Sequence, residues 1–83
     1  MTIEAEVEAY IISDLLHGRL SRIDPNDSLI SSGVLDSLTL LQLIAFLEEK
    51  YNIIVKDVDM NPNNFQTINI IKTFVEKKLE NPS

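Results

Sequence analysis

Apolar residues recur at every fourth position along the first part of the chain. The series begins at Ile3 and continues with Val7, Ile11 and Leu15. This spacing places them on one stripe and predicts an amphipathic helix from Thr2 to His17. Acidic residues occupy its first turns, where the helix dipole favours negative charge, and Gly18 suits a C-terminal cap.

A second helical pattern begins at Asp36 or Ser37, runs to about Tyr51 and ends at Asn52. At 100° per residue, five apolar positions share one sector about 100° wide, which we assign to the core. They are Leu40, Leu43, Ile44, Leu47 and Tyr51. Leu38 and Ala45 fall well away from this sector. Phe46 lies on its far flank, and the pattern leaves open whether it packs under the preceding loop or faces a partner. The helix has more apolar residues than its core face needs.

The connection between these helices, residues 19–35, contains turn signals at Asp24-Pro25-Asn26-Asp27 and Ser31-Ser32-Gly33. A connection this long is usually functional or disordered. Apolar residues along it favour an ordered loop that wraps around the core. They are Leu20, Ile23, Leu29, Ile30, Val34 and Leu35.

The rest of the chain is less regular. Ile53, Ile54 and Val55 are expected to be core-facing loop residues, because one short strand without a partner leaves its backbone groups unsatisfied. One helical turn is expected at residues 57–60, before Pro62 interrupts it. Thr67 is a credible N-cap for a last helix. The apolar stripe of that helix is Ile68, Ile71, Phe74, Val75 and Leu79.

Together these elements predict an all-α fold. We expect an irregular four-helix bundle, with a long ordered loop between helices one and two and a short third helix. A chain of 83 residues with 45% hydrophobic content supports one small core, so residues 1–83 are expected to form a single domain.

Composition excludes several classes of function. There is no cysteine and only one histidine, His17, so neither a thiolate nor a multi-histidine metal site is expected. The formal net charge of −6, with scattered basic residues, argues against a nucleic-acid partner. No apolar run approaches the roughly 18 residues of a membrane span, and the acidic N-terminus is unlike a signal peptide. We expect a cytoplasmic protein and a monomer.

Ser37 is the candidate functional residue. As a nucleophile it would need a nearby base, but the only imidazole, His17, lies at the end of the first helix, where it suits the helix dipole. The carboxylate pairs Glu48-Glu49 and Asp57-Asp59 are expected to lie on the solvated surface and not to form a catalytic pair. A hydroxyl in the first turn of a helix instead projects toward solvent, and the unpaired N–H groups of that turn favour a phosphodiester. An isolated Asp-Ser pair, however, is more often only a helix cap.

The segment Gly33-Val34-Leu35-Asp36-Ser37-Leu38 resembles the attachment motif of the acyl carrier protein family, which includes peptidyl, aminoacyl and D-alanyl carriers. The resemblance extends over nearly the whole chain. It includes the first helix, the long loop with Leu29 and Ile30, Glu48-Glu49-Lys50-Tyr51 at the end of helix two, and Phe65-Gln66-Thr67-Ile68 before the last helix.

This resemblance implies a covalent cofactor, 4′-phosphopantetheine from coenzyme A, attached to Ser37 by a phosphopantetheinyl transferase. The chain would then be a substrate and not an enzyme, holding acyl or aminoacyl groups as thioesters. Asp36 would hold the first turn and help to present the serine. Loading and downstream biosynthetic enzymes would dock on helix two, at Leu38, Gln42, Ala45, Glu48 and Glu49.

Some residues depart from the pattern of fatty-acid-synthesis carriers. Thr39, Leu40 and Gln42 make the helix-two face less acidic, and Gly33 lies four residues before Ser37. These differences favour a carrier of a specialised pathway over one of bulk fatty acid synthesis. Two other hypotheses remain open: an unmodified interaction module that binds through Leu38, Ala45 and Phe46, and a small hydrolase that uses Ser37 and His17.

Overall fold

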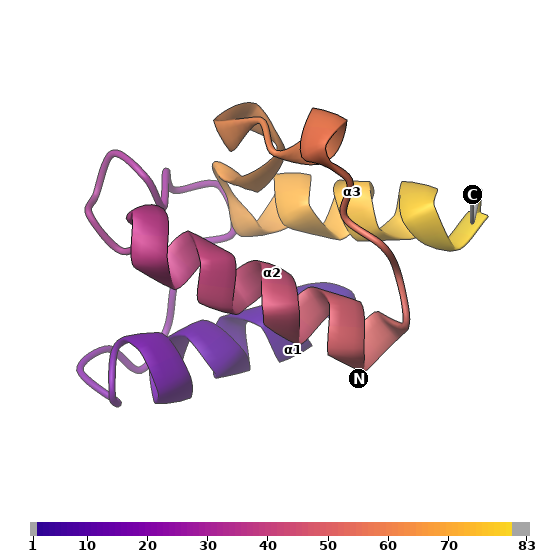
Figure 1. The fold of residues 1–83 in the computed structure, drawn as a ribbon. Coiled ribbons are helices and arrows are strands. Elements are labelled where there is room, and N and C mark those ends of the chain that lie inside the picture. The colour runs from indigo at the N-terminus through magenta and orange to yellow at the C-terminus, as the bar shows by residue number, and fades with distance from the viewer. Residues whose placement is uncertain (1, 81–83) are drawn as a thin grey trace.

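The computed structural model describes residues 2–80 and is all-helical over that range, with no β-strand (Figure 1). Three α-helices form the fold: α1 (Ile3–Tyr10), α2 (Ser37–Tyr51) and α3 (Ile68–Glu80). A π-helical segment, Ile11–Leu15, continues α1, and two 3-10 turns, Asp57–Asp59 and Pro62–Phe65, precede α3. The all-α prediction is confirmed, and the helical turn expected at residues 57–60 is present as the 3-10 turn Asp57–Asp59, but residues 2–80 contain three α-helices and not the four helices of the predicted bundle.

The first helix is shorter than the sequence pattern predicts. Thr2 caps α1 by accepting a hydrogen bond from the Ala5 N–H at 3.2 Å. After Tyr10 the helix widens into the π-helical segment, in which the Leu16 N–H donates to the Ile11 carbonyl. Four-residue spacing of apolar side chains does not distinguish an ordinary helical turn from a wider one. The segment ends at Leu15, so His17 lies beyond it and takes a left-handed conformation, with φ 54°.

The bounds of α2 agree with the prediction. Asp36 is its N-cap, and Asn52 ends it in a left-handed conformation with φ 55°. Leu43, Ile44 and Leu47 of the assigned core face are buried. The helix runs antiparallel to α1, as Figure 1 shows.

The flank of α2 that faces α1 carries an aromatic contact. Phe46 stacks on Tyr10 with ring centroids 4.1 Å apart. Of the two places left open for Phe46, the position under the long loop is excluded, because the ring packs against α1. Near the N-terminal end of α1, Glu6 accepts a hydrogen bond from the Tyr51 hydroxyl at 2.7 Å, which joins the same two helices again.

The connection between α1 and α2 is ordered and contributes to the core. Ile23, Leu29 and Leu35 are buried in it, while Leu20 is 47% exposed and does not anchor the loop as predicted. Two backbone hydrogen bonds tie it to the start of α3: the Leu29 N–H donates to the Gln66 carbonyl, and the Asn69 N–H donates to the Pro25 carbonyl. The loop therefore lies against α3 before it delivers the chain to α2.

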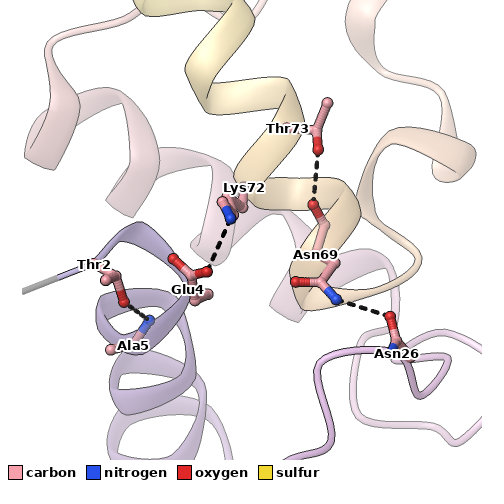
Figure 2. A network of polar contacts seen from close by, with 7 residues as sticks. All are labelled: Thr2, Glu4, Ala5, Asn26, Asn69, Lys72 and Thr73. Carbon is pink, nitrogen blue, oxygen red and sulfur yellow. Dashed lines mark hydrogen bonds and ion pairs between the residues drawn. The ribbon is translucent and has the colours of Figure 1, made fainter.

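Side chains strengthen the contacts of the loop and of α1 with α3. The Asn69 amide donates to the Asn26 side-chain oxygen at 2.8 Å, and Lys72 forms an ion pair with Glu4 of α1 at 3.1 Å (Figure 2). Thr73, one helical turn after Asn69, donates its hydroxyl proton to the Asn69 carbonyl. One face of α3 is thus joined to two segments that are distant in the sequence.

The segment between α2 and α3 alternates between buried and exposed residues. Ile53 is buried, Ile54 is 64% exposed and Val55 packs partly against the core. Successive side chains of extended backbone point to opposite sides, so the expectation that Ile54 faces the core is wrong. Asn61 caps the second 3-10 turn by accepting from the Asn63 N–H.

The predicted start of the last helix is confirmed, because Thr67 Oγ1 accepts a hydrogen bond from the Ile70 N–H at 3.0 Å. Phe65 is fully buried and meets Phe74 edge to face, with centroids 5.2 Å apart. Leu79 of the predicted stripe is 48% exposed, because it lies near the end of α3. All three helices and the loop contribute to one core, made of Val7, Ile11, Ile23, Leu29, Leu35, Leu43, Ile44, Leu47, Ile53, Phe65, Ile68, Ile71, Phe74 and Val75.

Candidate functional site

Ser37 is the first residue of α2 and lies exposed at the end of the helix that meets the long loop. The hydrogen bonds of this turn are made by Asp36 and Thr39, and among residues 2–80 none involves the Ser37 hydroxyl. Leu38, the next residue, is 65% exposed. The structure therefore leaves the Ser37 oxygen accessible to a second protein.

The turn that carries Ser37 is held by a reciprocal capping box. The Thr39 N–H donates to the Asp36 carboxylate at 2.9 Å, and the Asp36 N–H donates to Thr39 Oγ1 at 2.8 Å. The first helical hydrogen bond of α2 follows directly, from the Leu40 N–H to the Asp36 carbonyl. The predicted capping role of Asp36 is confirmed, whereas its partner Thr39 was not predicted.

The electrostatics of this turn favour negative charge. The Thr39 N–H, followed by the Thr39 hydroxyl, stabilises the charged form of Asp36 and lowers the pKa of that carboxyl below its usual value. The first N–H groups of a helix have no partner within the helix, and its dipole adds partial positive charge at this end. No residue from Ser37 to Leu47 carries a charge. Apart from the N-cap Asp36, an anion bonded to Ser37 would meet no acidic side chain along these turns of α2.

The five residues predicted to bind partners do not all have the same environment in the structure. Gln42, Ala45 and Glu49 line a shallow groove of about 390 Å³ between α2 and α1, which Tyr10 and Phe46 also line. Leu38 lies one turn closer to Ser37 on the exposed side of the helix.

Glu48 has a different environment from the other four. It is half-buried, and its carboxylate accepts a hydrogen bond from the Val55 N–H at 2.9 Å. This contact stabilises the backbone of the segment that follows α2, so Glu48 has a structural role there.

Several exposed apolar residues were not identified as candidates from the sequence. Leu41 of α2 is one of them, with 56% of its surface exposed. Three more lie in the segment after α2, where a short irregular stretch gives no periodic signal. They are Ile54, Val58 and Met60.

The surroundings of Ser37 give no support to a hydrolytic site. His17 is exposed beyond the end of the π-helical segment, and no hydrogen bond within residues 2–80 joins its imidazole to Ser37. No group of three or more histidine, cysteine, aspartate or glutamate side chains in this range is arranged to hold a metal ion. None of the helices in the described part of the chain is long and apolar enough to cross a membrane.

Comparison with known proteins identifies the family. Residues 10–75 match the family described as "Phosphopantetheine attachment site". The chain therefore belongs to this phosphopantetheine-binding family, whose members carry covalently attached 4′-phosphopantetheine and serve as carriers that are generally not catalytic themselves. Carriers of this family interact with phosphopantetheinyl transferases and with biosynthetic enzymes.

The fold is also similar to that of a solved structure. A chain in a structure titled "Crystal structure of FAD-dependent dehydrogenase" matches with a TM-score of 0.76 and 28% sequence identity. The match covers 83% of this chain and 97% of that one, so the two chains have similar lengths. The comparison with curated proteins gave no match.

The residues at the start of α2 fit a phosphate-linked group. Ser37 supplies an exposed hydroxyl, and the charge-free stretch that follows adds no repulsion of a phosphodiester beyond that of Asp36. The cofactor supplies a thiol at the end of a flexible arm, which this cysteine-free chain lacks. What the chain itself provides is an ordered first turn and the exposed surface beside it.

Proposed function

We propose that Ser37 is the attachment residue and that this protein carries acyl or aminoacyl groups as thioesters on a 4′-phosphopantetheine arm. The observation that carries the proposal is the exposed Ser37 hydroxyl, without a hydrogen bond of its own, in a first turn held by Asp36 and Thr39. The family match supports it, because Ser37 lies within residues 10–75.

In the proposed modification, Ser37 is the nucleophile, and the phosphopantetheinyl transferase catalyses its attack. A bond forms between Ser37 Oγ and the phosphorus of coenzyme A that bears the pantetheine. The bond from this phosphorus to the bridging pyrophosphate oxygen breaks, and adenosine 3′,5′-bisphosphate leaves. The hydroxyl proton passes to a base on the transferase. Asp36 contributes by capping the helix, because one oxygen of its carboxylate, Oδ1, accepts hydrogen bonds from both the N–H and the hydroxyl of Thr39.

The proposed docking surface consists of Leu38, Gln42, Ala45 and Glu49, and its closest member to the arm is Leu38. Its apolar residues are exposed without any partner in the described chain, and the groove beside it adds the aromatic pair Tyr10 and Phe46. The lack of charge from Ser37 to Leu47 favours partners that recognise apolar surface. This uncharged stretch of α2 supports a role in a specialised pathway in preference to bulk fatty acid synthesis.

A flavin enzyme is the proposed downstream partner. The similar chain of carrier length occurs in a structure whose title names a FAD-dependent dehydrogenase. Such an enzyme would remove two electrons and two protons from the tethered acyl group and reduce its flavin. Adding the acyl-loaded carrier to the candidate dehydrogenase should bleach the flavin absorbance, and equal bleaching by the same acyl group on free coenzyme A would argue against carrier-specific recognition.

The test of the proposed function is modification by a broad-specificity phosphopantetheinyl transferase with coenzyme A, followed by intact mass measurement. Wild-type protein should gain one phosphopantetheinyl group, and the Ser37→Ala variant should gain none. Ser31→Ala is the matched control, because Ser31 is also exposed and lies in the preceding loop. No mass gain in the wild type, or a gain that survives Ser37→Ala, would reject the assignment.

The alternative function is an unmodified interaction module that binds partners through the same apolar surface. The exposure of Leu38 and Ala45 is the observation in its favour. It predicts that Ser37→Ala retains partner binding and that protein isolated from cells carries no phosphopantetheine.

A further inference from the structure

We infer that Thr39 is a positioning residue for the modification of Ser37, an inference that rests on the proposed function. Thr39 lies two residues after Ser37, and its hydroxyl oxygen is the centre of the hydrogen bonds that close the first turn of α2. Within the hydrogen bonds described for this turn, Thr39 Oγ1 does not contact Ser37, so its effect would act through the backbone.

The Thr39 hydroxyl both accepts and donates. Its oxygen accepts the Asp36 N–H at 2.8 Å, and its single proton has the Asp36 carboxylate, at 3.0 Å, as its nearest acceptor. The Val34 carbonyl lies slightly farther away, at 3.4 Å. A hydrogen bond to a charged carboxylate is stronger than one to a neutral carbonyl, so the proton belongs on the bond to Asp36.

Ser37 and Leu38 are the two residues enclosed by this arrangement. Asp36 and Thr39 are bonded to each other in both directions, and the helical hydrogen bond from Leu40 to Asp36 adds a third connection. The backbone of Ser37 is therefore fixed on both sides, while its side chain remains exposed. This fixes the direction of its Cα–Cβ bond before any enzyme binds.

Such pre-ordering matters for phosphoryl-group transfer, because the attacking oxygen must lie in line with the bond that breaks. A nucleophile that is already oriented loses less entropy on reaching that geometry, and a small misplacement lowers the rate strongly. Removing the Thr39 hydroxyl should therefore lower the rate within the bound complex, which kcat reports. A change confined to the docking surface would appear mainly in KM.

The experiment compares Thr39→Val, which loses the hydroxyl at nearly constant shape, with Thr39→Ser, which keeps it. The Thr39 N–H bond to Asp36 survives in both variants, so the helix keeps part of its cap. Thr73→Val is the matched control, because it removes another threonine hydroxyl that bonds within a helix, on α3 (Figure 2). Thr39→Ala removes the same oxygen in a better helix former, in case the valine variant folds poorly.

Transferase assays with coenzyme A should give a kcat about five- to tenfold lower for Thr39→Val and Thr39→Ala, with KM within about twofold of wild type. Thr39→Ser and Thr73→Val should stay within about twofold of wild type in both parameters. In the unmodified protein, hydrogen exchange of the Asp36 amide should accelerate several-fold in the variants without the hydroxyl, because that amide loses its acceptor.

Wild-type kcat in the folded valine and alanine variants would overturn the inference while leaving Ser37 as the attachment residue. A serine variant as slow as the valine variant would overturn it as well. If wild-type protein accepts no phosphopantetheine at all, the proposed function fails and the inference fails with it, so the two failures are distinguished by the wild-type reaction.

Discussion

At the scale of the residue, Ser37 combines an exposed hydroxyl that makes no hydrogen bond with a backbone that the Asp36–Thr39 capping box fixes. The Asp36-Ser37 pair and its motif could be found in the sequence. The partner of Asp36 could not, because the capping box is usually signalled by glutamate or glutamine at the third helical position, and here Thr39 performs that part. A threonine in a helix has many other roles, so its type alone did not indicate this one.

The capping box makes a prediction about the titration of Asp36. Hydrogen bonds from the Thr39 N–H and then from its hydroxyl lower the Asp36 pKa. The Thr39→Val variant removes only the second, so the pKa should rise part of the way toward its usual value. Carboxyl-detected NMR titration of both proteins measures this change, and an identical Asp36 pKa in the two would show that the hydroxyl contributes nothing.

The sign of the linked effect on stability follows from the lowered pKa. Because Asp36 has a lower pKa when folded than when unfolded, its contribution is complete above the unfolded pKa, near 3.8, and is lost as the pH falls through the folded value. The wild type and the Thr39→Val variant should therefore differ more in stability at neutral pH than in strong acid.

At the scale of the element, α2 has a core face, an exposed face and a flank against α1. Periodicity predicted the core face and its bounds, since helical spacing reports which side chains share a direction. It could not show that Phe46 stacks on Tyr10, because the partner of a flank depends on how two helices pack. For the same reason the separate environment of Glu48 was not predicted.

The exposed apolar face of α2 predicts that a charge introduced there slows the reaction with the transferase. Leu38→Asp should leave the fold intact, because Leu38 is exposed, and should slow phosphopantetheine transfer several-fold by placing a charge on an apolar contact. Leu79→Asp, on exposed α3 surface, is the matched control and should have little effect.

Steady-state kinetics of the transferase with each variant measures this effect. A Leu38→Asp protein that is modified as fast as wild type would exclude Leu38 from the contact.

At the scale of the whole molecule, the long loop is a structural part of the core and not an appendage. Its apolar residues predicted this, although periodicity could not distinguish Leu29, which is 1% exposed, from Leu20, which is 47% exposed. Loop residues lack a regular spacing, so their burial depends on contacts such as the backbone bond from Leu29 to Gln66. The 3-10 turn Asp57–Asp59 agrees with the helical turn expected at residues 57–60, whereas the second turn, Pro62–Phe65, was not predicted, for the same reason.

The packing of the loop predicts that substitutions at Leu29 and at Leu20 lower the free energy of unfolding by different amounts. Leu29→Ala should lower the free energy of unfolding by about 2–5 kcal/mol, the usual cost of a large-to-small change in a core. Leu20→Ala should cost less than about 1 kcal/mol, because its side chain is half exposed. Urea unfolding followed by circular dichroism measures both values, and similar losses for the two variants would contradict the packing of this loop.

The central claim is that Ser37 holds the arm, and the most direct measurement is peptide mass spectrometry of the protein isolated from cells that make it. Digestion and fragmentation should place a phosphopantetheinyl group on the peptide that contains Gly33 to Leu38, with the fragment ions assigning it to Ser37. A phosphopantetheinyl group on any other residue, or a fully unmodified Ser37 in cells with an active transferase, would contradict the account.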